Sequence, residues 1–215
     1  MRRVFQQELL EVRERLVEIS LLVASSIQSA TRAFNDPDLE LAESVIAGDD
    51  EIDALVAGLD ELVVDILARQ QPVARDLRIL VSALRISSSL ERMGDLGEHI
   101  ALIARYRHPE HAVPAPLRPT FARMGELDVR LAEKLSVLLR DEDVELAAEM
   151  GRDDDLIDEL HASVFDTLLR DDWEGTPEDT VDATLASRYH ERFADHAVSI
   201  ARKVHYLATG ERPPL

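Results

Sequence analysis

Four pairs of acidic side chains are spaced so that both carboxylates of each pair lie on one face of a helix. The pairs follow the pattern acid-x-x-x-Asp and are Asp49/Asp53, Glu91/Asp95, Asp154/Asp158 and Glu191/Asp195. Like charges one helical turn apart repel each other by roughly 0.2–0.5 kcal/mol. Because this unfavourable arrangement occurs four times at matched places, we expect some other interaction to offset the repulsion.

The chemistry that such pairs support is the binding of hard or borderline metal ions. Carboxylate oxygens suit Mg²⁺, Mn²⁺, Ca²⁺ and iron, and a neighbouring imidazole would favour iron, manganese or zinc. The histidines nearest to the pairs are His99, His161 and His196. The chain has no cysteine, which excludes disulfides, iron–sulfur clusters and thiolate zinc sites. Any metal site must therefore use oxygen ligands, with or without histidine nitrogen.

The alternative interpretation of these pairs is a solvated acidic surface with salt bridges inside the helices. Arg85, Arg92 or Arg188 would then pair with Glu91 or Asp95. A chain with 43 acidic residues produces pairs of this spacing by chance, and each histidine alone is typical of a structural or surface residue. Repetition at matched places in both halves of the chain favours the metal, and both interpretations stay open at this point.

The overall charge limits the classes of partner. The 215 residues include 43 acidic and 24 basic side chains, for a net charge of −19. This surplus argues against wrapping nucleic acid or lying unaided on anionic lipid, because both need positive charge. No apolar run approaches the roughly 18 residues of a membrane-spanning helix, and the first residues lack the apolar segment of a secretion signal. We therefore expect a cytoplasmic protein without a membrane span.

Apolar residues recur at spacings of three and four along most of the chain, which predicts an all-α fold. Helices are expected over residues 5–34, 39–69, 73–106, 120–139, 143–170 and 177–207. Four prolines fall within residues 108–119, so this segment is the expected linker. The predicted organisation is a first repeat over 1–107, the linker, and a second repeat over 120–215.

An internal repeat relates the two halves. The segment Asp38–Ala42 matches Asp143–Ala147 at an offset of 105, and Glu91-Arg92-x-x-Asp95 recurs 100 residues later. A repeat of this length predicts two copies of one structural unit. We therefore expect two tandem, pseudo-symmetric three-helix bundles, each with its own small core. Aromatic residues make up only 4% of the chain, so those cores should be aliphatic.

Several other residues carry weaker signals. Gly94 lies in an expected helix, where it would permit close helix approach. Arg75 and Arg78 follow a turn and either bind an anionic partner or are solvated. Trp173 lies in a polar loop and is interpreted as an anchor that packs the loop down. The serines at 87–89 lack a neighbouring base, so no nucleophilic role is expected.

Three segments, together with the acid pairs, resemble the PhoU family of phosphate-specific transport system accessory proteins. They are QPVARDLR (Gln71–Arg78), LERMGDLGEHIA (Leu90–Ala101) and RYHERFADHAVSIARKVHYLATGE (Arg188–Glu211). The resemblance covers essentially the whole chain and both repeats, and the family fold is a pair of three-helix bundles. Two departures are His190, where the family usually has an apolar residue, and Gly97, where alanine is usual.

The resemblance implies a regulator and not an enzyme. Proteins of this family act as negative regulators of the phosphate-starvation (Pho) regulon and modulate phosphate uptake. They link the phosphate ABC transporter to a sensor histidine kinase of a two-component system, at the inner face of the membrane. The resemblance also implies bound Mg, Mn, Fe or Zn ions, held by all eight residues of the acid pairs. Long amphipathic helices are compatible with a homodimer as well.

Two other functions compete with this interpretation. A ferritin-like di-metal carboxylate protein needs Glu-x-x-His pairs on facing helices. The chain has none, and the nearest pattern is the unpaired Asp158-x-x-His161. A metal-free helical scaffold is the other alternative, and it predicts neither bound metal nor a phosphate phenotype on deletion. Oxygen-dependent turnover of added Fe²⁺ and measured metal content separate the three.

Overall fold

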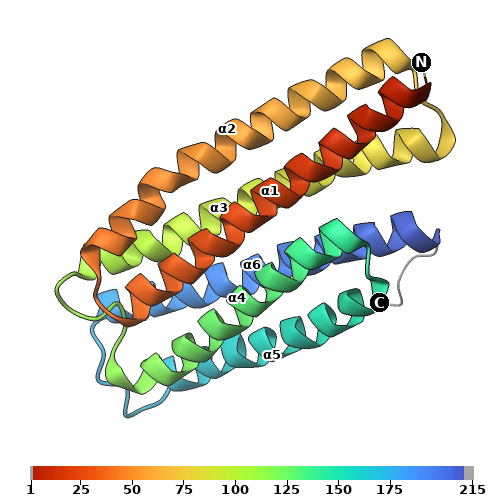
Figure 1. Ribbon diagram of the computed structural model, residues 1–215. Coiled ribbons are helices and arrows are strands. Elements are labelled where there is room, and N and C mark those ends of the chain that lie inside the picture. Colours follow the sequence, from red (N-terminus) through yellow and green to blue (C-terminus); the bar gives the residue numbers. More distant parts are fainter. Residues whose placement is uncertain (1, 211–215) are drawn as a thin grey trace.

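The computed structural model describes residues 2–210 and is helical almost throughout (Figure 1). The long helices are α1 (Arg2–Asn35), α2 (Leu39–Gln70), α3 (Ala74–Arg107), α4 (Arg118–Asp141), α5 (Val144–Leu168) and α6 (Pro177–Thr209), and η1 (Ala115–Leu117) is a short 3₁₀ helix. Residues 2–210 contain no strand, so the predicted all-α class is confirmed. Glu211, the last residue of the third quoted segment, and the rest of 211–215 lie outside the described residues.

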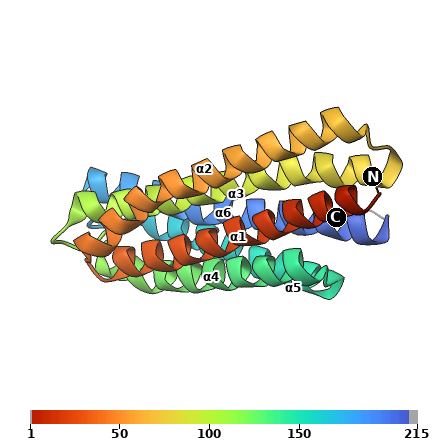
Figure 2. The same cartoon turned by 45° about the horizontal axis from the view of Figure 1, so that its top comes forward.

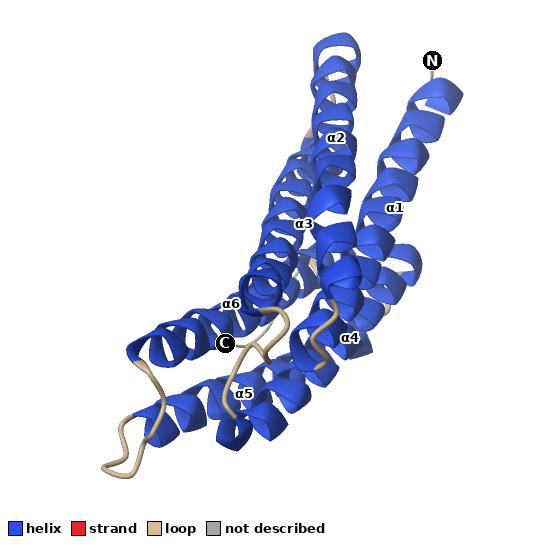
Figure 3. Ribbon diagram, turned by 90° about the vertical axis from the view of Figure 1, so that its left-hand side faces the viewer, coloured by secondary structure: helices blue, strands red, loops and turns tan. Residues whose placement is uncertain are grey.

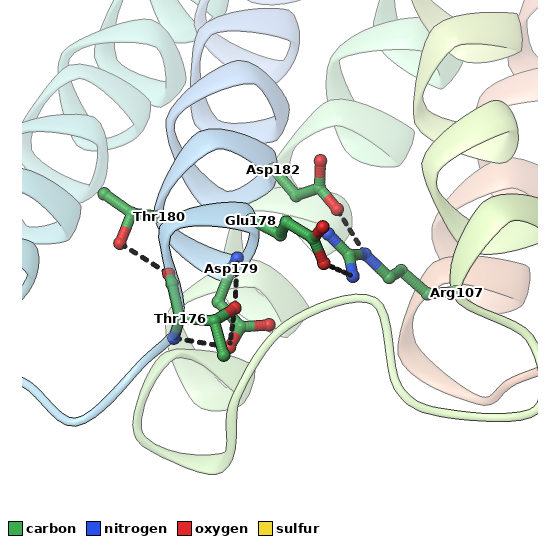
Figure 4. A network of polar contacts seen from close by, with 6 residues as sticks. All are labelled: Arg107, Thr176, Glu178, Asp179, Thr180 and Asp182. Atoms are coloured by element: carbon green, nitrogen blue, oxygen red, sulfur yellow. Dashed lines mark hydrogen bonds and ion pairs between the residues drawn. The ribbon is translucent and has the colours of Figure 1, made fainter.

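Side chains at the helix starts define where α2, α5 and α6 begin. The Asp38 carboxylate accepts a hydrogen bond from the Leu41 amide at 3.0 Å, and Asp143 caps α5 in a similar way. Thr176 and Asp179 bond to each other's backbone amides in a capping box, which Figure 4 shows. Such caps satisfy amides that have no partner inside the helix. They account for how closely the helix starts agree with the sequence prediction.

The helices form two bundles of three that pack side by side. Helices α1, α2 and α3 contact one another, as do α4, α5 and α6. The bundles meet where α1 packs on α4 and α3 packs on α6, each pair running antiparallel (Figure 1). Figures 2 and 3 place α2 and α5 on the outer sides of this arrangement. None of the described helices has the length and apolarity to cross a membrane.

An ion pair joins the two bundles at the end where α3 stops and α6 starts. The Arg107 guanidinium donates to Asp182 at 2.5 Å and to Glu178 at 3.4 Å (Figure 4). Arg107 is in the last turn of α3, and both acids lie in the first two turns of α6. The positive charge at the C-terminal end of α3 and the negative charges at the N-terminal end of α6 therefore also interact favourably with the helix dipoles.

The two bundles share one hydrophobic core, so the expectation of a separate small core in each repeat is wrong. The buried apolar residues of all six long helices form a single cluster. Phe34 of α1 and Phe121 of α4 have ring centroids 5.2 Å apart across the boundary between the bundles. Phe193 of α6 is also fully buried. The core is thus mainly aliphatic, with phenylalanines buried in it. It is continuous because α1, α3, α4 and α6 each pack against helices of both bundles.

The Pro-rich segment 108–119 packs against the bundles along part of its length. Ala112, Val113 and Leu117 are buried, and the His111 ring lies 3.2 Å from the backbone oxygen of Asn35. Its last two residues already belong to α4, where proline fits the first turn because that turn needs no amide donor. The segment is therefore a packed connection.

Trp173 anchors the loop between α5 and α6. Its ring is half-buried against the core, and its indole N–H donates to the Thr180 hydroxyl at 3.0 Å. Gly175 lies directly beneath the ring, where a Cβ atom would come within 2.2 Å of it. These contacts agree with the interpretation of Trp173 as a loop anchor.

Candidate metal centre

Three carboxylates of the first repeat converge between α2 and α3. Asp49 and Asp53 come from α2 and Asp95 from α3, and one oxygen of each lies within 4.8 Å of the other two. Asp49 and Asp95 are half-buried, whereas Asp53 is exposed. We call these three residues the α2/α3 centre. Its all-oxygen donor set and spacing are compatible with a hard divalent cation.

The electrostatics of Asp49 show why a cation would be favourable here. Burial raises the pKa of Asp49 to about 6, and the neighbouring charges of Asp53, Glu98 and Asp95 add to the rise. One carboxylate oxygen, Oδ1, is buried without a hydrogen-bond partner. A buried polar atom left in this way costs about 1–3 kcal/mol. The residues present therefore fit a metal ion that would satisfy this oxygen and neutralise the group.

Gly94 of α3 has no side chain, and this leaves room for the Asp49 carboxylate of α2. A Cβ atom at Gly94 would lie 2.8 Å from Asp49 Oδ1 and 3.3 Å from Ile52 Cδ1. The predicted close helix approach is thus present, and one of its two partners is a site carboxylate. Gly97, one turn later, faces α1, where a Cβ atom would lie 3.1 Å from the Ser26 hydroxyl.

We expect Gly94→Ala to displace Asp49 and to weaken metal binding at the α2/α3 centre. The clash also predicts a loss of about 1–3 kcal/mol of folding stability, which is typical of overpacking. Gly48→Ala is the matched control, because a Cβ atom there meets nothing within 4 Å. This control should stabilise α2 by up to about 1 kcal/mol through helix propensity. Urea unfolding and titration with Mn²⁺ measure both effects; equal behaviour of the two variants would contradict the geometry.

The second repeat holds the equivalent acids between α5 and α6. Burial raises the pKa of Asp154 to about 7, with further contributions from the charges of Asp158 and Asp195. The pKa of Asp158 is raised as well, by burial and by Asp195. The acids of the two helices therefore face each other. Among residues 2–210, however, only the α2/α3 centre brings three carboxylate oxygens within 4.8 Å.

An arginine bonds to one acid in each of the two acidic clusters, between α2 and α3 and between α5 and α6. The salt-bridge interpretation is therefore correct for those two acids. Arg92 donates to Asp95 at 2.8 Å, and Arg188 donates to Glu191 at 2.5 Å. The other oxygen of Glu191 is buried without a partner, and burial raises the pKa of this side chain. Glu91 is not a member of the α2/α3 centre. The eight predicted ligands thus divide into three that converge closely and five in looser arrangements.

The three neighbouring histidines lie outside the α2/α3 centre. The His99 ring packs beside Tyr189, with centroids 5.1 Å apart, and its Nδ1 is buried without a partner. His161 Nδ1 lies 3.1 Å from the Ser187 hydroxyl. Burial lowers the pKa of His196, and the nearby charge of Arg192 lowers it further. None of these contacts makes a histidine a member of that centre.

Sequence reasoning missed a buried ionisable pair between α4 and α6. His190 Nδ1 and Asp128 Oδ2 are 2.6 Å apart, and the side chains are 1% and 0% exposed. Burial raises the pKa of Asp128 to about 6, although His190 opposes the rise. Asp128 stands where the apolar stripe of α4 continues from Met124 to Leu131. A charged residue in that stripe, with a histidine at an inward position of α6, is the signal that could have revealed the pair.

The fold and the acidic clusters define an all-helical protein built from two copies of one unit. A family model described as "PhoU domain" matches residues 16–104 and again residues 121–204. The chain therefore belongs to the PhoU family, and the sequence-based assignment is confirmed. This is a family of regulatory accessory proteins and not of enzymes.

Relatives and solved structures agree over nearly the whole chain. The Mycobacterium tuberculosis phosphate-specific transport system accessory protein PhoU homolog 2 is 42% identical over 99% of this chain and all of its own length. The crystal structure of PhoU from Pseudomonas aeruginosa has a TM-score of 0.86 at 28% identity, covering 96% of this chain and all of that one. The phosphate transport system regulatory protein PhoU from Streptococcus pneumoniae has a TM-score of 0.84 at 26% identity, covering 98% and 100%. The predicted pair of three-helix repeats is confirmed.

Proposed function

We propose that this protein is a negative regulator of the phosphate-starvation regulon. In this role it is an adaptor that links the phosphate ABC transporter to a sensor histidine kinase and modulates phosphate uptake. The observation that carries the proposal is the match along 99% of the chain to a phosphate-specific transport system accessory protein at 42% identity. A cytoplasmic location at the inner face of the membrane, reached through protein partners, is part of the same proposal.

A metal ion is the proposed cofactor, and Asp49, Asp53 and Asp95 would hold it in the first repeat. Asp154, Asp158, Glu191 and Asp195 would form the equivalent site in the second repeat, and Glu91 would complete the first. A bound divalent cation supplies positive charge that cancels the mutual repulsion of these acids. The carboxylates would then hold α2 against α3, and α5 against α6, with a fixed outer surface. Such a surface suits an adaptor, because docking favours a preorganised binding site.

The decisive test of the regulatory role is deletion of the gene from its host. We expect expression of phosphate-starvation genes to become constitutive when phosphate is plentiful, because the repressing adaptor is missing. The measurement is a reporter fused to a phosphate-starvation promoter, compared at high and low phosphate. Normal repression at high phosphate in the deletion strain would contradict the proposal and favour the metal-free scaffold. A pull-down with the cytoplasmic part of the sensor kinase tests the adaptor role separately.

A further inference from the structure

Basic side chains gather where α3 packs against α6: the charges of Arg92 and Arg192 act on His196, and that of Arg85 acts on Lys203. We call this group the α3–α6 seam, and its members are Arg78, Arg85 and Arg92 from α3 and Arg192, His196 and Lys203 from α6. The α3 arginines recur every seven residues, which keeps them on one face and spaces them by about 10 Å. The three arginines of α3 and Arg192 are exposed, whereas His196 and Lys203 are half-buried.

The two helices bring these charges together in antiparallel register. The rings of His99 and Tyr189, tilted toward each other with centroids 5.1 Å apart, mark that register. One and two heptads before His99 along α3, Arg92 comes opposite His196 and Arg85 opposite Lys203. The pKa of Lys203 is accordingly lowered, by burial and then by the charge of Arg85. The seam is therefore an electropositive strip on a strongly acidic protein.

Most of these charges have no counter-ion. Within residues 2–210, no carboxylate lies within 4.0 Å of Arg78, Arg85, Arg192 or Lys203. The Lys203 amine donates only to the backbone and hydroxyl oxygens of Ser199, at 3.1 and 2.6 Å. A chain with 43 acids and 24 bases has ample carboxylates to neutralise these groups. Because like charges that stay close without counter-ions repel one another, the strip is complementary to an anionic ligand.

We propose that the α3–α6 seam is the docking surface for an acidic helical segment of a protein partner. From Arg78 to Arg92 the strip extends about 21 Å along α3, which suits a row of carboxylates on a helix better than a single small anion. Acids of the two clusters border the strip: Asp95 contacts Arg92, and the charge of Asp195 acts on His196. A flat anionic membrane would lie over those acids too, whereas a single helix about 10 Å wide can follow the strip alone. The inference deepens the proposed adaptor function and rests on it for its biological setting.

The probe is a fluorescent, glutamate-rich helical peptide of about 20 residues, which spans about 30 Å. Its anisotropy is followed as the full-length protein is added, and a photoreactive group in the peptide maps the contact by mass spectrometry. We expect the double variant Arg85→Glu/Lys203→Glu to bind at least about tenfold more weakly, because like charges would then face each other. Raising the ionic strength should weaken wild-type binding as well. Cross-links should fall on α3 and α6.

The matched control is Arg3→Glu/Arg152→Glu, which changes the net charge equally at exposed positions outside the seam. Circular dichroism confirms that both double variants fold. The proposal would be overturned if the seam variant bound the peptide as tightly as the wild type, or if the control variant lost as much affinity as the seam variant. Cross-links outside α3 and α6 would also overturn it. So would stronger binding to phosphatidylglycerol vesicles than to the peptide, because the seam would then be a membrane contact. The readout uses no phosphate regulation, so its failure is distinct from failure of the deletion test.

Discussion

Replacing Asp128 with alanine is expected to destabilise the protein by about 3–5 kcal/mol. Among residues 2–210, the substitution leaves His190 buried without a hydrogen-bond partner, and removing one member of a buried hydrogen-bonded pair of ionisable groups has an effect of up to this size. It also leaves a void next to His190, whose ring packs against Phe34 and Phe121. Equilibrium unfolding in urea, followed by far-ultraviolet circular dichroism, measures the loss. A change below about 1 kcal/mol would mean that the pair adds little.

Removing both members of the pair is the informative companion to that variant. Asp128→Leu/His190→Leu replaces the pair with apolar side chains, and such replacements are often neutral or stabilising. We therefore expect the double variant to be more stable than Asp128→Ala alone. Asp128→Asn keeps an acceptor for His190 Nδ1 and should have an intermediate effect. If the double variant is the least stable of the three, packing dominates over ionic pairing at this position.

Binding of a divalent metal is expected to stabilise the protein strongly, and more so at pH 7.5 than at pH 5. Each occupied site adds about 2.7 kcal/mol at a metal concentration of 100 Kd, or about 5–10 °C in Tm for a chain of this size. The pKa values of Asp49 and Asp154 are raised to about 6 and about 7, so these two groups hold more protons in the folded metal-free protein than in the unfolded chain between pH 4 and 7. Its stability should therefore fall as pH rises through this window, and metal should reverse the loss.

Ligand variants assign this effect to particular residues. Asp49→Ala/Asp95→Ala should remove the metal of the α2/α3 centre, and Glu91→Ala/Asp95→Ala tests the wider set predicted from sequence. Plasma mass spectrometry of the purified protein measures bound metal, and thermal unfolding with and without Mn²⁺ measures the coupling. Asp50→Ala is a control from the same turn of α2, because Asp50 is exposed and outside the centre. Metal content that stays unchanged in both double variants would exclude these residues as ligands.

The local structure of the chain was predictable from sequence because its signals are short-range. Helix periodicity depends on residues three and four apart, and the predicted helix ends lie close to those observed. The caps at Asp38 and Thr176 act within one turn of their helices. The repeat and the acid pairs were equally visible, because a matched offset needs no knowledge of packing. The shared core was not predictable in this way. An apolar stripe on a helix looks the same in sequence whether it packs against helices of one bundle or of both.

The sequence by itself determined that this chain is all-helical, duplicated and rich in paired acids, and that it resembles the family to which it belongs. Only the tertiary structure decided which acids meet: Asp95 joins Asp49 and Asp53, whereas Glu91 stays outside the centre. It also decided that Asp128 finds His190 across 62 residues of chain. The physical reason is that spacing along one helix defines the face on which a side chain lies. The identity of the opposing side chain depends on how two helices are placed and in what register, which is a property of the packed core.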